Sequence, residues 1–322
     1  MENAIEVPAG TKIGILSDCH GMVEPLRAAL EDMKKKGITM IFSLGDNIGV
    51  GPNPKEVMDL LEEYGVISVA GNAEDYVVFG PESFPYIMRD KRHGGSRVDD
   101  IDWTRNKLTP EQLDRIKKYP RSIDLIIGGK RVALCHFFTD VRTARKEYGV
   151  FAYQKNFDIE TGERVSDGVD FDSYVNSDEE KKHHLYLIRK SNDKWYKDHP
   201  NTLDNPFTRG LRDALDKPLF GGKKIHVYDA IFQGHVHFKL CDRGSTTIHS
   251  IRAVGMGDVD VSSDKVSYVI VTAKEDGYDV EEVTDVSYDR KSLIRSILDS
   301  DNNSSLARKY VGIDESGMPI KK

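Results

Sequence analysis

The chain has 322 residues, and its 46 basic and 53 acidic side chains give a formal net charge of −7. This length can bury a full hydrophobic core, either as one large domain or as a domain with an insertion. A mildly acidic chain is a poor candidate for stable nucleic-acid binding, and no apolar run reaches the roughly 18 residues that a membrane span needs. The N-terminus has no signal-like apolar segment, and the three cysteines are not closely spaced, so a cytoplasmic location is expected.

The first third of the chain predicts strands that alternate with helices. Three short apolar runs have the composition of buried strands: residues 12–17, 40–44 and 67–70. A helix is predicted between the first two, with Gly37 as its stop. Its buried stripe repeats at helical spacing: Leu26, Ala29, Leu30 and Met33.

The second predicted helix has a clear start. Asn53 can cap it, Pro54 suits its first position, and Glu56 stands where a capping box places an acid. Gly65 ends it. Strands alternating with helices pair in parallel through right-handed crossovers, so the carboxyl ends of these strands share one edge, where open α/β sheets bind ligands.

The later part of the chain predicts a second sheet. Ser122–Ile127 and residues 131–136 form a hairpin, and Ala230–Gln233 is another strand. A closing hairpin is expected at residues 266–272 and 278–283. A terminal helix at 290–298 and a polar, loosely held tail at about 299–322 complete the chain.

Five short blocks place potential metal ligands directly after apolar runs. They are Asp18-Cys19-His20, Gly45-Asp46-Asn47-Ile48-Gly49, Gly71-Asn72-Ala73-Glu74, His136, and Gly234-His235-Val236-His237. Imidazole nitrogens, carboxylates and an amide oxygen suit Mn, Fe, Zn or Mg better than metals that prefer thiolates. Each residue alone has an ordinary explanation as a helix cap, a turn former or a packed histidine. The occurrence of five such blocks at predicted strand ends favours a metal site over five separate ordinary explanations.

The order and local sequence of these blocks resemble the calcineurin-like metallophosphoesterase superfamily. The stretch from Gly45 to Pro54 looks most like its small bacterial phosphodiesterase-type branch. The resemblance implies an α/β fold, a four-layer αββα sandwich of two mixed β-sheets flanked by helices. Residues 1–322 would then form a single domain, with an insertion or cap at 140–226 that is either a substrate-selecting lid or a surface elaboration.

The resemblance also implies a role for each ligand. The first metal would be held by Asp18, His20 and His237, the second by Asn72, His136 and His235, with Asp46 bridging both. The expected cofactors are two divalent ions, Mn or Fe first, with Zn, Mg or Ni as alternatives. A hydroxide shared by the two ions would attack phosphorus in line, with Asp46, His20 and Asn72 as the catalytic residues.

The chain departs from the family pattern at two positions. Ala73 stands where most relatives have a histidine that resembles a general acid, and Gly49 replaces the last acid of the second block. General acid catalysis is typically worth ~10²–10⁴ in rate, so esters with acidic leaving groups should suffer least. The leading hypothesis is therefore a metal-dependent phosphodiesterase or nucleotide hydrolase acting on a small phosphoester. A Ser/Thr phosphatase-like phosphomonoesterase and a non-catalytic metal-binding scaffold are the alternatives.

Overall fold

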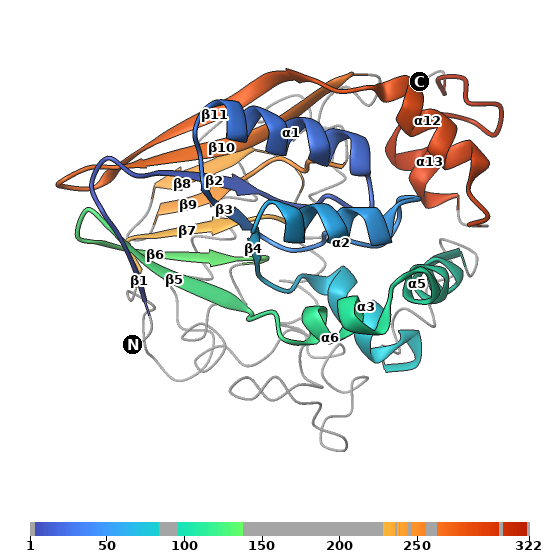
Figure 1. Cartoon of the computed structure of the whole chain (residues 1–322), viewed down its shortest axis with the longest axis horizontal. Coiled ribbons are helices and arrows are strands. Elements are labelled where there is room, and N and C mark those ends of the chain that lie inside the picture. The colour runs from blue at the N-terminus through green and yellow to red at the C-terminus, as the bar shows by residue number, and fades with distance from the viewer. Residues whose placement is uncertain are drawn as a thin grey trace, which may run out of the picture.

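The computed structural model describes most of the chain outside one long central stretch. Its described residues are 4–83, 96–137, 228–235, 237, 239–243, 247–255, 263–302 and 305–320. The insertion expected at 140–226 lies outside them, so its role stays a prediction. Within the described residues the chain forms two stacked mixed sheets with flanking helices, as the αββα prediction requires (Figure 1).

The five-stranded sheet contains the first predicted strands. Its order is β11 (Tyr278–Ser287), β10 (Lys265–Ala273), β2 (Lys12–Leu16), β3 (Met40–Ser43) and β4 (Ile67–Ser68). β2, β3 and β4 pair in parallel, which confirms the prediction from their helical connections. β10 and β11 form the predicted closing hairpin, and β10 pairs antiparallel with β2.

The six-stranded sheet also has parallel strands at its centre. Its order is β1 (Ile5–Val7), β5 (Ser122–Ile127), β6 (Lys130–Cys135), β7 (Ala230–Gln233), β9 (Thr247–Ser250) and β8 (Leu240–Arg243). The predicted β5–β6 hairpin is confirmed, and β7 pairs in parallel with β6. β1, β8 and β9 were not predicted, because these short edge segments have no strong alternating pattern.

Helices α1 (Val23–Lys35) and α2 (Pro54–Glu63) cover the outer face of the five-stranded sheet (Figure 1). The predicted α1 stripe is fully buried in the core between helices and sheet. α2 begins at Pro54 as predicted, but the Asn53 side chain makes no capping hydrogen bond. The capping box expected with Glu56 is therefore absent.

Three further helices, with no counterpart in the sequence prediction, lie together beyond β4 (Figure 1). They are α3 (Asn72–Phe79), α5 (Ser96–Lys107) and α6 (Pro110–Lys117), with a short 3₁₀ turn at Pro81–Ser83. α6 has a complete capping box, in which the Thr109 hydroxyl accepts from the Gln112 amide and the Gln112 side chain accepts from the Thr109 amide. That signal was readable in the sequence.

The C-terminal segment differs from the polar tail expected at about 299–322. After α12 (Arg290–Asp299), helix α13 (Leu306–Tyr310) packs back on the protein. Apolar side chains of this segment form one core cluster with α12 and with the loops after β2 and β3: Met22, Val50, Leu293, Ile297, Leu306, Ala307, Val311 and Ile313. Burial of a few well-spaced apolar groups holds the segment despite its polar average composition.

The space between the two sheets is filled by a separate apolar cluster that includes Ile13, Phe42, Leu125 and Phe232. It fixes the sheets face to face, so the carboxyl ends of β2, β3, β4, β6 and β7 open on a common region. No helix in the described part of the chain is long and apolar enough to cross a membrane.

Candidate metal centre

The backbone at the predicted ligands is unusual. Six non-glycine residues of the described chain have positive φ, between 48° and 70°, and five of them are predicted ligands: Asp18, His20, Asp46, His235 and His237. The sixth is Val50 in the loop after Asp46. Side chains with a Cβ rarely adopt this left-handed region, and such strain concentrates at functional sites.

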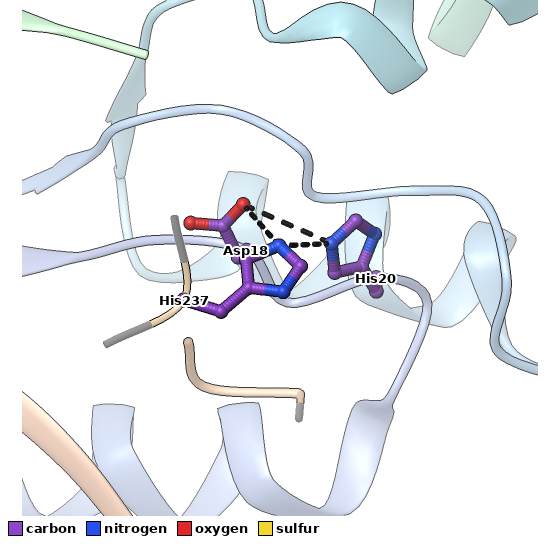
Figure 2. Close-up of side chains that lie close together, drawn as sticks. All are labelled: Asp18, His20 and His237. Atoms are coloured by element: carbon purple, nitrogen blue, oxygen red, sulfur yellow. Dashed lines mark hydrogen bonds and ion pairs between the residues drawn. The ribbon is translucent and has the colours of Figure 1, made fainter. Parts of the chain in front are cut away.

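The first cluster consists of Asp18, His20 and His237. The Asp18 Oδ1 atom lies 3.2 Å from His237 Nε2 and 3.7 Å from His20 Nε2. The two imidazole Nε2 atoms are 3.2 Å apart. Figure 2 shows all three groups pointing at one another from the loops after β2 and β7. The arrangement gives one oxygen and two nitrogens around a common point.

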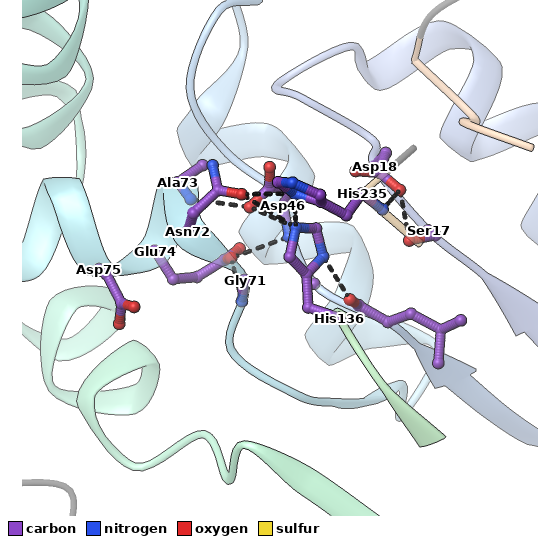
Figure 3. A network of polar contacts seen from close by, with 12 residues as sticks. Ser17, Asp18, Asp46, Gly71, Asn72, Ala73, Glu74, Asp75, His136 and His235 are labelled. Atoms are coloured by element: carbon purple, nitrogen blue, oxygen red, sulfur yellow. Dashed lines mark hydrogen bonds and ion pairs between the residues drawn. The ribbon is translucent and has the colours of Figure 1, made fainter. Parts of the chain in front are cut away.

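The second cluster gathers Asn72, His136 and His235 around another point (Figure 3). Asn72 Oδ1 is 3.1 Å from His136 Nε2 and 2.9 Å from His235 Nδ1, and these two nitrogens are 3.1 Å apart. On its far side, His136 Nδ1 donates to the backbone oxygen of Leu44 at 2.8 Å. That bond fixes the tautomer and leaves the Nε2 lone pair facing the cluster, as in metal-binding histidines.

Asp46 lies between the two clusters. Its Oδ1 is 3.5 Å from His136 Nε2, and its Oδ2 is 3.9 Å from His20 Nε2. One carboxylate oxygen therefore faces each cluster, the placement that a bridging ligand needs.

The histidine pair after β7 contributes one side chain to each cluster. Two histidines two residues apart share a face only if the strand continues through them. Here β7 ends at Gln233, and both His235 and His237 have positive φ. The turned backbone sends His235 to the second cluster and His237 to the first.

The hydrogen bonding of Asp18 fits a ligand of a divalent cation. Asp18 Oδ2 accepts from the Ser17 hydroxyl at 2.6 Å and from the His235 amide at 3.0 Å. Asp18 Oδ1 is buried with no hydrogen-bond partner and points into the first cluster. A buried carboxylate oxygen left unpaired costs free energy unless a cation compensates it.

The electrostatics of the first cluster favour the protonation states that bind metal. Burial and then the charge of His237 lower the pKa of His20 to about 3, so its imidazole is neutral at pH 7. Burial acts to raise the pKa of Asp18, but His237, His136 and His20 outweigh it and hold that pKa below its usual range. A neutral His20 imidazole and a charged Asp18 carboxylate are the forms that bind metal.

Glu74 supports the Asp46 loop. Its carboxylate accepts the backbone N–H groups of Asp46, Asn47 and Gly71, each at 2.8 Å, and the Asn47 side-chain amide at 3.2 Å (Figure 3). Burial and then the charge of Asp46 raise the pKa of Glu74 to about 7, while its backbone hydrogen bonds favour the charged form.

Two glycines let the ligand loops approach each other. A Cβ on Gly71 would collide with Asp46 Oδ1, and a Cβ on Gly234 would collide with the Ser17 hydroxyl. The glycines of the third and fifth blocks are therefore required by the close approach of the Asp46 and Ser17 side chains.

Cys19 and Cys135 are buried free cysteines beside ligands in the sequence. Neither belongs to a potential metal-binding group in the described residues. Two residues that sequence reasoning missed lie near the predicted ligands: Tyr310, whose ring centroid is 6.0 Å from that of His20, and Arg97, whose charge acts on His20. No local motif marks either of them.

Comparison with known proteins finds a matching family model, a relative by sequence and similar solved structures. A family model for the calcineurin-like phosphoesterase superfamily domain matches residues 11–157. An uncharacterized protein of Methanocaldococcus jannaschii is 31% identical over 211 residues, which cover 65% of this chain and 80% of that protein.

Two solved structures support the fold. A hypothetical protein of Pyrococcus horikoshii gives a TM-score of 0.57 at 15% identity, over 94% of this chain and 100% of that one. A metallophosphoesterase of Sphaerobacter thermophilus gives a TM-score of 0.50 at 18% identity, over 96% of both chains. The family model and the relative confirm the family resemblance, and the solved structures confirm the fold class predicted from the sequence.

Proposed function

The chain belongs to the calcineurin-like phosphoesterase superfamily, and on that premise we propose that it is a dinuclear phosphodiesterase or nucleotide hydrolase. The observation that carries the proposal is the placement of Asp46, with one carboxylate oxygen toward each ligand cluster. The first ion would be held by Asp18, His20 and His237, and the second by Asn72, His136 and His235. Bound divalent cations would supply a water of lowered pKa as nucleophile and positive charge opposite the phosphoryl oxygens.

The protein's own groups preorganise this centre. The Ser17 hydroxyl and the His235 amide orient Asp18, and the Leu44 carbonyl fixes the His136 tautomer. The Ala73 amide donates to Asp46 Oδ1 at 2.7 Å. Ligands held by such outer hydrogen bonds need little rearrangement when a cation binds, and loss of outer partners typically costs 10- to 100-fold in metal affinity or activity.

The substrate preference follows from the side chain at position 73. Alanine cannot donate a proton to a departing oxygen, so the site favours leaving groups that are stable as anions. Aryl and nucleotide phosphates meet this condition better than simple alkyl phosphates. Small phosphoesters of this kind are the proposed substrates, and the choice of Mn or Fe as the physiological ions remains part of the proposal.

The decisive experiment combines metal analysis with a panel of phosphoesters. The native protein should contain two divalent ions and hydrolyse diesters or nucleotides, whereas Asp46→Asn should lose at least one ion and lower turnover by at least about 100-fold. Asp276→Asn, at the exposed turn between β10 and β11, is the matched control and should behave as native. Native turnover with two ions in Asp46→Asn would refute the assignment. Two bound ions without hydrolysis of any ester would favour a metal-binding scaffold.

A further inference from the structure

The two positions at which the chain departs from its family pattern are neighbours in space. A Cβ built on Gly49 would lie 3.5 Å from the Ala73 Cβ. Neither residue brings a polar side chain to this side of the metal centre. Any contact to a substrate phosphate here must come from other parts of the chain.

Arg97 supplies positive charge on this side. Ala73 and Tyr76 are one turn apart on α3 and so share a face. The guanidinium carbon of Arg97, in the first turn of α5, lies 5.3 Å from the Tyr76 ring centroid. The Arg97 charge also acts on the ligand His20 and on Tyr310. The guanidinium thus lies beside the face of α3 that carries Ala73 and Tyr76. Its charge also acts on His20 in the first cluster.

Tyr310 brings a hydroxyl to the same region from the end of α13. Its ring is tilted 53° to the His20 ring, with centroids 6.0 Å apart, and it packs on the cluster that contains Met22 and Val50. In the described part of the chain the Tyr310 hydroxyl has no hydrogen-bond partner. It is also not one of the fully buried unpaired side-chain atoms there, so it is partly accessible. The ring is fixed by packing while its polar atom is available.

One carboxylate ties these elements to the Asp46 loop. Asp100 on α5 accepts from the backbone amide of Val50 and from the Asn302 side chain, both at 2.9 Å. Val50 is the sixth non-glycine residue with positive φ and follows Gly49. The start of α5, the metal loop and the segment that leads to α13 are therefore held in a fixed relation, which a preorganised binding group requires.

We infer that Arg97 and Tyr310 form a phosphate-binding pair beside the metal centre, with the guanidinium as charge partner and the phenol as hydrogen-bond donor to phosphoryl oxygens. The inference rests on the proposed function for the identity of the substrate group. Guanidinium groups match phosphate oxygens in charge and geometry. Both side chains keep their protons at neutral pH, so the pair contributes binding and orientation, unlike a histidine that gives up its proton.

The test measures binding of inorganic phosphate to Mn²⁺-loaded, desalted protein by calorimetry, together with metal content. Arg97→Gln should weaken phosphate binding by roughly 10- to 100-fold and Tyr310→Phe by roughly 3- to 10-fold, with metal content unchanged. Arg97→Lys should recover part of the loss. Arg105→Gln, on the exposed side of α5, and Tyr288→Phe, which removes another hydroxyl packed against the same cluster, are the matched controls and should bind as native.

Three results would overturn the inference: native affinity in both variants, loss of bound metal in parallel with loss of phosphate, or no phosphate binding by the native loaded protein. The Phe variant is informative because it keeps the ring contact with His20 and removes only the hydroxyl. Phosphate binding that depends on Arg97 and Tyr310 in a protein that hydrolyses no ester would support the pair and refute the proposed function. Ester hydrolysis with unaltered phosphate binding in the variants would support the proposed function and refute the phosphate-binding pair.

Discussion

Glu74 should be the residue that holds the Asp46 turn, and its replacement gives a quantitative test. At pH 8, above its pKa of about 7, the carboxylate accepts three backbone N–H groups and one side-chain amide. A buried donor left without an acceptor costs about 1–3 kcal/mol. In Glu74→Ala three backbone donors lose their acceptor, and even with partial access of water the free energy of unfolding should fall by about 4 kcal/mol.

Glu74→Gln is the sharper variant because it preserves shape. Its amide offers one oxygen in place of two, so in the better orientation the Asp46 and Gly71 amides keep an acceptor and the Asn47 amide faces an NH₂ group. One unpaired backbone donor predicts a loss of about 2 kcal/mol. Glu31→Gln on the exposed face of α1 is the matched control, and its unfolding free energy should stay within about 0.5 kcal/mol of native.

Urea unfolding of metal-free protein, followed by circular dichroism, measures these differences without the contribution of bound ions. The denaturant dependence should be unchanged, so the midpoints report stability directly. After reloading, Glu74→Gln should also retain less metal, since the Asp46 turn is no longer held. Stability within about 0.5 kcal/mol of native and full metal content in Glu74→Gln would show that the turn holds itself and that the reasoning is wrong.

Three further predictions concern other parts of the structure. Arg121 makes a two-bond ion pair with the buried carboxylate of Asp75 on α3, so Arg121→Met should cost about 3–5 kcal/mol in urea unfolding, and adding Asp75→Asn should recover part of it. In metal-free protein His20 stays neutral down to its pKa of about 3, so stability should fall as pH drops below about 6.5, where the unfolded chain takes up the proton. His20→Asn should flatten this slope in calorimetry, and an unchanged slope would contradict the neutral state. Ala73→His should raise rates on alkyl esters by up to ~10²-fold relative to aryl esters, and parallel leaving-group plots for the two proteins would mean that another acid already acts.

The sequence by itself determined the class of fold and the candidate ligands. Apolar runs and the α1 stripe are local patterns. The spacing of the apolar residues in each pattern predicts whether a strand or a helix buries them. The family order of the five blocks then identified the superfamily. Residues such as Asp46 and His136 were readable because each directly follows an apolar run, and strand ends meet at one edge of a sheet.

Only the tertiary structure decided how the predicted ligands are divided between the two clusters. The left-handed backbone at His235 and His237 sends these two residues to different clusters, whereas a continued strand would place both on one face. The division of the Asp46 oxygens between the two clusters depends on loops from both sheets. Such backbone strain is imposed by surrounding contacts and leaves no signature in residue type.

Long-range packing decided the position of the C-terminal segment and of Tyr310. Tyr310 meets His20 because Leu306, Val311 and Ile313 bury a short apolar face against the loops after β2 and β3, although the average composition of that segment reads as a polar tail. The free energy of such a contact depends on the partner surface as much as on the segment itself. A pattern within one stretch of sequence carries no information about a surface formed nearly 300 residues away.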